Sequence, residues 1–209
     1  MRTAAIDSVL RNYPALLEAL DNISNESHDD YGRRANGILT QLERFDTFFG
    51  LKLSHLVFSA TEQTSNALQG KNTTVQEALK AASMAKSYLT RQRDDKAYDD
   101  FYSATVAQSQ QYTDDPVLPR YRRPPKRLDG GAAPHNFTTP RDYFRVQYFE
   151  VLDLLNDEIS RRFDQASLAL PRAIEELLTK ASNHSDETDI SVPNAIVEAY
   201  SREINVRKL

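Results

Sequence analysis

The chain has 209 residues, of which 40% are hydrophobic and 27% charged, and its 26 basic and 30 acidic residues give a net charge of −4. This composition is rich enough to bury a core as one domain or two small ones, which excludes a disordered tail. The absence of cysteine excludes disulfides and thiolate-ligated metal sites, and the four histidines lie far apart without ligand spacing, so we expect no metal and no cofactor.

The sequence predicts neither a secretory signal nor a membrane span. Its start, Met-Arg-Thr-Ala-Ala-Ile-Asp, lacks an apolar core, and nowhere does it contain a run of about 18 apolar residues, which a span requires. We therefore expect no membrane partner and a nuclear or cytoplasmic location.

Apolar residues recur at helical spacing from the beginning of the chain. The first stripe runs from Ile6 to Ile23, and Pro14 either starts a second helical segment or kinks a single helix. The second stripe runs from Ile38 to Leu56 and predicts one helix, interrupted only by Gly50, which costs about 1 kcal/mol relative to alanine.

Two further helices are expected before residue 113. Thr74 and Glu77 have the spacing of a capping box and precede a face of alanines that favours close packing. Asp94 or Asp95 can cap the next helix, whose face carries Tyr98, Phe101 and Tyr102.

Helical periodicity returns after residue 139. Thr138 or Thr139, followed by Pro140, is typical of the start of a helix, and this one extends to Arg162. A shorter helix is expected near 171–181 and a last one around Ile196, Val197, Tyr200 and Ile204. The sequence thus predicts an all-α fold, a helical bundle of roughly seven helices. We expect a helical block over 1–112, a basic connector rich in proline and glycine over 113–139, and a second block over 140–209.

The connector holds the most informative segment of the chain. Between residues 120 and 127 it concentrates five cations in eight residues, and four prolines between 116 and 125 predict an extended backbone that displays them. These side chains are the candidate nucleic-acid-binding residues: Arg120, Tyr121, Arg122, Arg123, Lys126 and Arg127.

Three interpretations of this segment remain open. The cations suit contacts with DNA phosphates, and Tyr121 suits stacking on an exposed base. The segment also fits a structural linker whose arginines pair with acidic helices, and a nuclear localisation signal. Paired carboxylates such as Asp94-Asp95 are more typical of helix caps than of a two-metal site.

Several stretches, in order, resemble transposases of the hAT superfamily, and more narrowly the transposon-derived group named zinc-finger MYM-type protein 1-like. They are Ser-Val-Leu-Arg-Asn-Tyr-Pro-Ala-Leu-Leu at 8–17, Gln-Leu-Glu-Arg-Phe-Asp-Thr-Phe-Phe-Gly-Leu-Lys-Leu at 41–53, Val-Leu-Pro-Arg-Tyr-Arg-Arg-Pro-Pro-Lys-Arg at 117–127 and Asp-Tyr-Phe-Arg-Val-Gln-Tyr-Phe-Glu-Val-Leu-Asp at 142–153. The resemblance covers roughly residues 3–181.

The resemblance implies that the chain corresponds to the helical insertion of a ribonuclease H-like catalytic core. It also implies truncation at both ends, since the family's two catalytic aspartates would precede residue 1 and its glutamate would follow residue 209. We therefore expect no catalytic residue and no enzymatic activity. The expected function is that of a non-catalytic, transposase-derived fragment that contacts DNA. The alternative is a helical module for protein binding or self-association, with no role in nucleic-acid binding.

Overall fold

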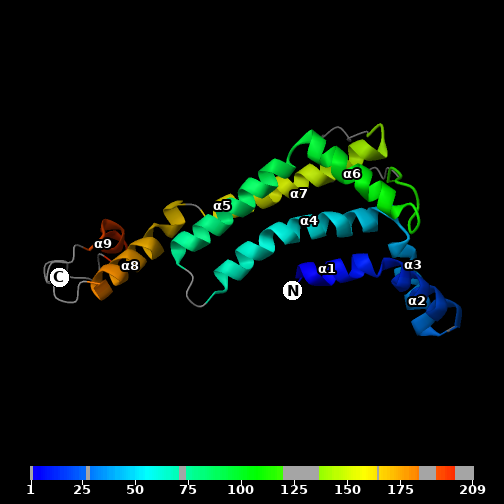
Figure 1. Cartoon of the computed structure of the whole chain (residues 1–209), viewed down its shortest axis with the longest axis horizontal. Helices are drawn as coiled ribbons and strands as arrows, with labels where there is room; N and C mark the ends of the chain where they lie inside the picture. Colours follow the sequence, from blue (N-terminus) through cyan, green and yellow to red (C-terminus); the bar gives the residue numbers. More distant parts are fainter. Residues whose placement is uncertain are drawn as a thin grey trace, which may run out of the picture. The chain divides into compact units, whose positions relative to one another are not determined.

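The computed structural model describes residues 2–26, 29–70, 74–119, 137–163, 165–183 and 192–200. The regular secondary structure of these ranges is helical, which confirms the predicted all-α fold (Figure 1). The helices are α1 (Arg2–Arg11), α2 (Tyr13–Glu26), α3 (Asp30–Leu42), α4 (Phe45–Leu68), α5 (Val75–Gln92), α6 (Asp95–Ser109), α7 (Pro140–Arg162), α8 (Gln165–Asn183) and α9 (Asn194–Ala199).

The described residues thus form nine helices rather than roughly seven, because two expected elements are divided. The first division falls between α1 and α2, where Pro14 occupies the first turn of the new helix. Proline is accepted there because a first-turn amide has no partner within the helix. Of the two possibilities that the sequence left open, the structure selects two helices.

The second division corrects the prediction of one helix from Ile38 to Leu56, since α3 ends at Leu42 and α4 begins at Phe45. Two carbonyls at this break accept hydrogen bonds from distant residues. The Tyr13 hydroxyl donates to the Leu42 carbonyl at 2.6 Å, and the Asp114 amide donates to the Glu43 carbonyl at 2.7 Å. These tertiary bonds satisfy carbonyls that the end of a helix leaves without partners.

The chain divides into two compact units. Unit 1 comprises Met1–Ser59 and Thr90–Asp153, and unit 2 comprises Ala60–Leu89 and Leu154–Leu209. Each unit therefore combines segments from both sides of the connector. The expected division into 1–112, 113–139 and 140–209 stays a prediction.

The core of unit 1 is built from aromatic rings of α4, α6 and α7. Phe49 lies 4.7 Å from Phe144 and 5.5 Å from Phe101 between ring centroids, and Phe45 lies 5.0 Å from Phe144. Phe45, Phe49 and Phe144 are all buried. Edge-to-face and tilted contacts of this kind stabilise a core beyond the burial of apolar area. These side chains are therefore core residues of unit 1.

The buried tyrosines of unit 1 also bind the backbone. Tyr98 donates a hydrogen bond to the Arg141 carbonyl at 2.6 Å, and Tyr148 donates one to the Gln92 carbonyl at 3.2 Å. Burial raises the pKa of Tyr13 to about 12, and burial is also the main cause that raises the pKa of Tyr98. The neutral hydroxyls therefore act as fixed donors at ordinary pH.

Charged side chains set the register of α6 against α7. Arg145 pairs with Asp95, and Arg141, one turn earlier on α7, pairs with Asp99, one turn later on α6. The two helices therefore run antiparallel. The Phe149 ring lies under two guanidinium groups, those of Arg93 at 4.3 Å and Arg145 at 4.7 Å from the ring centroid.

Unit 2 is packed with smaller side chains. Ala82 and Ala85 of α5 are buried, and the Thr64 hydroxyl of α4 donates to the Ala81 carbonyl at 3.1 Å. Small side chains let two helix backbones approach closely. Farther along the chain, the Glu175 carboxylate accepts a hydrogen bond from the Val75 amide at 3.0 Å. This long-range cap ties α8 to the start of α5.

The predicted helix starts agree with the structure. Thr74 and Glu77 form the reciprocal hydrogen bonds of a capping box, at 3.0 and 3.2 Å. The Asp94 carboxylate accepts hydrogen bonds from two amides at the start of α6. The Thr139 hydroxyl, just before Pro140, accepts one from the Asp142 amide in the first turn of α7. Local sequence therefore determines these three starts.

No helix within the described ranges is both long and apolar enough to cross a membrane.

Candidate functional site

The residues predicted to bind nucleic acid lie outside the described residues. These are Arg120, Tyr121, Arg122, Arg123, Lys126 and Arg127, all within 120–136. The described residues on either side of this range belong to unit 1. Their geometry shows where the two flanks of the connector are attached.

The two described parts of the connector, 113–119 and 137–139, both come near Tyr143, in the first turn of α7. Pro119 lines a cavity together with Tyr143, and the Phe137 ring meets the Tyr143 ring edge-on at 5.4 Å between centroids. Pro119 and Phe137 therefore both lie near this side chain, within one structural unit.

The first part of the connector is extended and is attached at the break between α3 and α4. It runs over 113–119 without regular secondary structure, and the hydrogen bond from the Asp114 amide to the Glu43 carbonyl fixes its beginning. Pro116 and Pro119 restrict its backbone to an extended conformation. Val117 remains 68% exposed, so this segment lies on the surface of unit 1.

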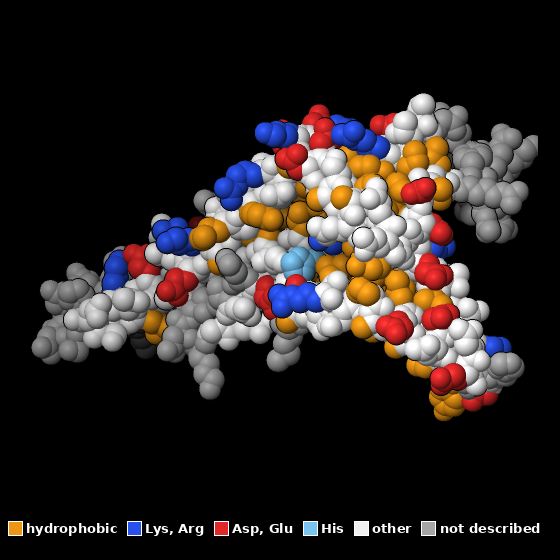
Figure 2. All heavy atoms as spheres, turned by 45° about the vertical axis from the view of Figure 1, so that its right-hand side comes forward, with side chains coloured by type: hydrophobic (Ala, Val, Ile, Leu, Met, Phe, Trp, Pro, Cys, Tyr) orange, Lys and Arg blue, Asp and Glu red, His pale blue; other side chains and the backbone are white. Residues whose placement is uncertain are grey.

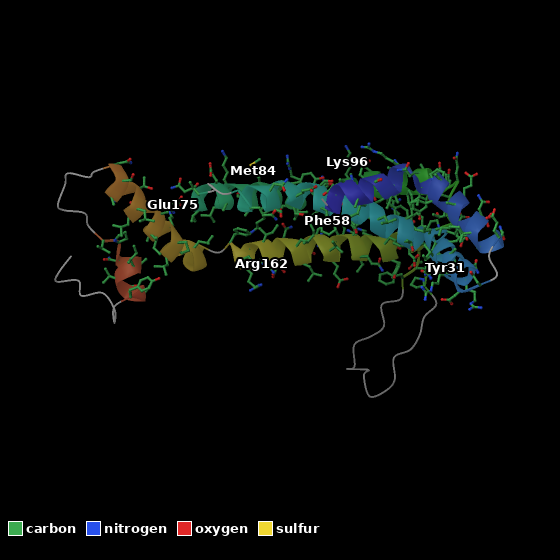
Figure 3. All side chains as sticks on the ribbon, turned by 90° about the horizontal axis from the view of Figure 1, so that it is seen from below. Tyr31, Phe58, Met84, Lys96, Arg162 and Glu175 are labelled. Carbon is green, nitrogen blue, oxygen red and sulfur yellow. The ribbon has the colours of Figure 1, made fainter. Side chains whose placement is uncertain are left out.

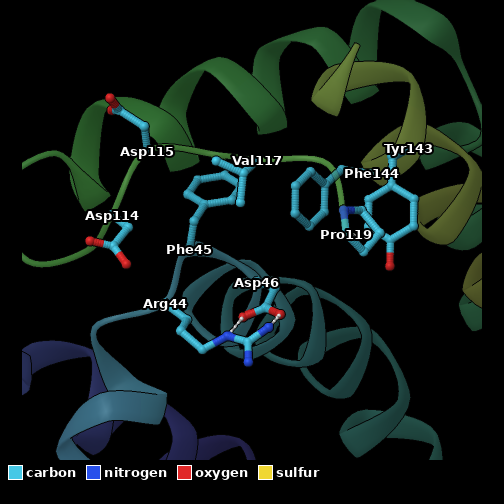
Figure 4. A pocket seen from close by; sticks show the side chains of 9 residues that line it. All are labelled: Arg44, Phe45, Asp46, Asp114, Asp115, Val117, Pro119, Tyr143 and Phe144. Atoms are coloured by element: carbon cyan, nitrogen blue, oxygen red, sulfur yellow. Dashed lines mark hydrogen bonds and ion pairs between the residues drawn. The ribbon is translucent and has the colours of Figure 1, made fainter. Parts of the chain in front are cut away.

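A cavity of about 320 Å³ lies between this segment, the start of α4 and the start of α7 (Figure 4). It is lined by Arg44, Phe45, Asp46, Asp114, Asp115, Val117, Pro119, Tyr143 and Phe144. The two carboxylates of the extended segment lie at one end, and Pro119 lies with Tyr143 and Phe144 at the other. A cavity of this size is at the lower limit for ligand pockets.

The lining carries more negative than positive charge. Arg44 is the cation of the lining, and its guanidinium forms a two-point ion pair with Asp46, at 3.0 and 2.5 Å. Among the described residues, the carboxylates of Asp114 and Asp115 have no hydrogen-bond or ion-pair partner. Three carboxylates and one guanidinium give the lining a formal charge of −2.

The aromatic wall of the cavity is preorganised. Phe45 and Phe144, only 3% and 2% exposed, belong to the aromatic core of unit 1, and Tyr143 packs on Phe144 at 5.1 Å between centroids. These rings are held by neighbours on α4 and α6. The cavity itself was not predicted from the sequence.

The described helices offer little concentrated, unpaired positive charge. Most of their arginines form ion pairs, including Arg11 with Asp7, Arg93 with Asp153 and Arg161 with Glu158. Two guanidinium groups, those of Arg161 and Arg162, lower the pKa of Glu158 to about 2 through hydrogen bonds. On the face drawn in Figure 2, basic and acidic side chains lie next to one another.

Several paired carboxylates of the helices act as caps and ion-pair partners. Asp29 accepts hydrogen bonds from two amides at the start of α3, and Asp94 does the same for α6. Asp95 and Asp99 pair with arginines of α7. Within the described part of the chain, no three His, Cys, Asp or Glu residues come together as a possible metal site.

The face predicted for the last helix is only partly available for binding. Within α9, Ile196 is 6% exposed and packs in the α8–α9 pair, while Tyr200, just after the helix, is 39% exposed. Ile204 lies outside the described residues. A larger exposed apolar pair is found on α3, where Tyr31 is 72% and Ile38 is 52% exposed. The sequence placed Ile38 on the apolar face of one predicted helix that extends to Leu56.

Comparisons with protein-family models and with solved structures find no match for this chain. The resemblance to hAT transposases therefore stays a prediction based on the ordered motifs. The motif at 8–17 spans the break between α1 and α2, and the motif at 41–53 spans the break between α3 and α4. The motif at 142–153 lies within α7 and contributes much of the aromatic core of unit 1.

Proposed function

We propose that the chain is a non-catalytic helical fragment of a hAT-like, transposase-derived protein whose connector contacts the DNA backbone. The proposed contacts are Arg120, Tyr121, Arg122, Arg123, Lys126 and Arg127. The observation that carries the proposal is the concentration of five cations in eight residues of a chain with a net charge of −4. Such a cluster supplies a local attraction to phosphates that the whole molecule lacks.

Two features of the described structure support this role. The flanks of the connector, at Pro119 and Phe137, are both attached beside Tyr143 of unit 1. Because that unit has an aromatic core with hydrogen-bonded tyrosines, it offers a rigid base on either side of the cluster. Most arginines of the described helices form ion pairs, which leaves the connector as the strongest candidate for phosphate binding.

The catalytic steps of the resembled family are assigned to residues outside this chain. In the parent protein, the helical fragment would brace the catalytic core and help to form the DNA channel. A nuclear location follows from this role.

The test is a fluorescence-anisotropy titration of labelled duplex DNA with the full chain at several salt concentrations. We expect log Kd to rise linearly with log salt concentration. Alanine at all five cations of 120–127 should reduce the slope by about 0.9 for each phosphate that the variant no longer binds. An unchanged slope would contradict the proposal.

A matched control removes the same charge elsewhere. Five exposed cations on α5, α6 and α8 that have no ion pair among the described residues can be changed to glutamine together: Lys80, Lys86, Arg91, Lys96 and Arg172. Lys96 is labelled at the upper edge of Figure 3. If this variant loses as much salt dependence as the connector variant, the attraction comes from total charge and not from the connector.

The exposed apolar pair on α3 favours self-association as a second candidate function. Tyr31 and Ile38 are seven residues apart, so they lie two turns apart on one helix face, and both are mainly exposed. Exposed apolar side chains on one face are typical of helix-mediated interfaces.

Size-exclusion chromatography with light scattering tests this candidate without DNA. A concentration-dependent dimer that becomes monomeric in the Y31S/I38S double variant would support it. The M84S/L178S variant is a suitable control, since both of its residues are exposed to a similar degree in unit 2. A monomer at all concentrations would exclude self-association through this face.

A further inference from the structure

We propose that the cavity of unit 1 is a binding site for an arginine or lysine side chain of a protein partner. This site is separate from the proposed DNA contact and has the opposite charge. Its occupant would be a basic side chain in an extended segment of the partner.

The shape and chemistry of the lining support this occupant. The cavity of about 320 Å³ suits one long side chain rather than a large ligand. Five of its nine lining residues are apolar or aromatic: Phe45, Val117, Pro119, Tyr143 and Phe144. These walls match the aliphatic stem of an arginine or lysine, which buries readily against apolar surface.

The carboxylates provide the matching charge. Asp46 already pairs with Arg44, whereas Asp114 and Asp115 have no side-chain partner among the described residues. Both residues lie at one end of the cavity, but the Asp115 carboxylate points away from the rings in Figure 4, so a stem against the aromatic wall would bring its charged head nearer to Asp114. Carboxylates bind a guanidinium through charge-assisted hydrogen bonds.

The same charges disfavour nucleic acid in this cavity. A phosphate there would face a lining with a formal charge of −2, and the guanidinium of Arg44 is already engaged by Asp46. The backbone of the extended segment favours a peptide instead. Within the described residues, the amides of Val117 and Leu118 form no backbone hydrogen bond, and an extended peptide is the kind of partner that pairs with such amides.

The experiment is a titration of the ¹⁵N-labelled full chain with a short extended peptide, acetyl-Ala-Pro-Arg-Pro-Ala-amide, followed by NMR. The matched probe carries citrulline in place of arginine, which keeps the shape and removes the charge. We expect shifts of the amides at 44–46, 114, 115, 117, 118, 143 and 144 with the arginine peptide, and much weaker binding of the citrulline peptide. Equal binding of the two peptides would overturn the proposal.

Two variants of equal charge test the assignment to residues. The D114N/D115N variant should raise the Kd for the arginine peptide about fivefold to tenfold, since exposed ion pairs contribute modestly. The E18Q/D100N variant neutralises two exposed carboxylates elsewhere in unit 1 and should change Kd less than about twofold. An equal loss of peptide affinity in both variants would show that net charge alone causes the effect, and it would contradict the assignment of the site to Asp114 and Asp115.

The cations of the chain's own connector require one more control, because Arg120 directly follows Pro119 in the sequence. A tethered cation has a high effective concentration. The titration is therefore repeated on the variant with alanine at the five cations of 120–127. If the arginine peptide binds both the natural chain and this variant, the result supports an external partner. If the peptide binds the variant alone, the connector's own cations occupy the cavity, and the proposal of an external partner is overturned. No DNA is present, so this result is independent of the proposed DNA contact.

Discussion

Units 1 and 2 are both helical, but their cores are built from different side chains. Unit 1 buries large aromatic rings, among them Tyr13, Phe49, Tyr98 and Phe144, and several of its tyrosine hydroxyls bind backbone carbonyls. The residues described as buried in unit 2 include no aromatic ring: they are the small Thr64, Ala82, Ala85 and Ala173, together with Leu89 and Ile196. The comparison indicates that unit 1 is the more stable platform, and both proposed binding sites are attached to it.

The difference also explains where the chain places specific polar contacts. In unit 1 the hydroxyls and the arginine–aspartate pairs fix the register of α6 against α7 around an aromatic core. In unit 2 the Thr64 hydroxyl joins α4 to α5, and a carboxylate of α8 caps α5. Large rings need many matched neighbours, whereas small residues allow close packing of backbones with fewer side-chain constraints.

The largest effect is expected from removing a ring at the centre of unit 1. Phe144 is 2% exposed and contacts rings from both α4 and α6, so F144A should lower the free energy of unfolding by about 3–5 kcal/mol. Leu154, on the same helix, is 62% exposed, so L154A should change the free energy of unfolding by less than about 0.5 kcal/mol. Urea denaturation followed by circular dichroism measures both, and similar losses would contradict an aromatic core.

The small-residue face of unit 2 can be tested by enlarging a side chain. Ala85 is 4% exposed, so A85L should destabilise the protein by about 1–3 kcal/mol through overpacking. Ser83 lies on the exposed side of the same helix, and S83L should be nearly neutral. If A85L increased stability in denaturant titrations, the alanine face would not be closely covered.

The sequence predicted the local features of this fold, but not the features that depend on tertiary contacts. Periodicity identified the helical fold, and the spacing of Thr74 with Glu77 identified a helix start, because both signals are local. The break at Glu43 and Arg44 could not be predicted, since it depends on hydrogen bonds from Tyr13 and Asp114. The cavity was missed for the same reason: its walls come from three segments that only the fold brings together.

High pH should weaken unit 1 through its tyrosines. The folded state raises the pKa of Tyr13 to about 12, above the unfolded value of 10.0, because burial disfavours the charged phenolate. The stabilisation from this group is complete below about pH 10 and is lost as the pH rises toward 12, because the unfolded state then releases its proton more readily. Thermal melting between these values should show Tm falling with pH.

The Y13F variant separates ionisation from packing. It loses the hydrogen bond to the Leu42 carbonyl, so it should be less stable at neutral pH. Its Tm should nevertheless fall less steeply at high pH, because phenylalanine does not ionise. Parallel curves for Y13F and the natural chain would exclude Tyr13 as a source of the alkaline effect.

The smallest effect is a gain in stability at Gly50 of α4. A Cβ built at this exposed position meets nothing within 4 Å, so alanine fits without a clash. G50A should raise the free energy of unfolding by about 0.5–1 kcal/mol, because glycine is a poor helix former. Denaturant titration measures the change, and a loss of stability would show that α4 needs the glycine for a contact with another element.

Hydrogen–deuterium exchange of the full chain tests most directly the claim that unit 1 is the stable platform. Helices α4 and α7 each contribute to both units, so each provides an internal comparison within one helix. We predict slower exchange for the amides of 45–59 and 140–153, in unit 1, than for those of 60–68 and 154–162, in unit 2. Equal or slower exchange in the unit 2 segments of both helices would contradict the claim.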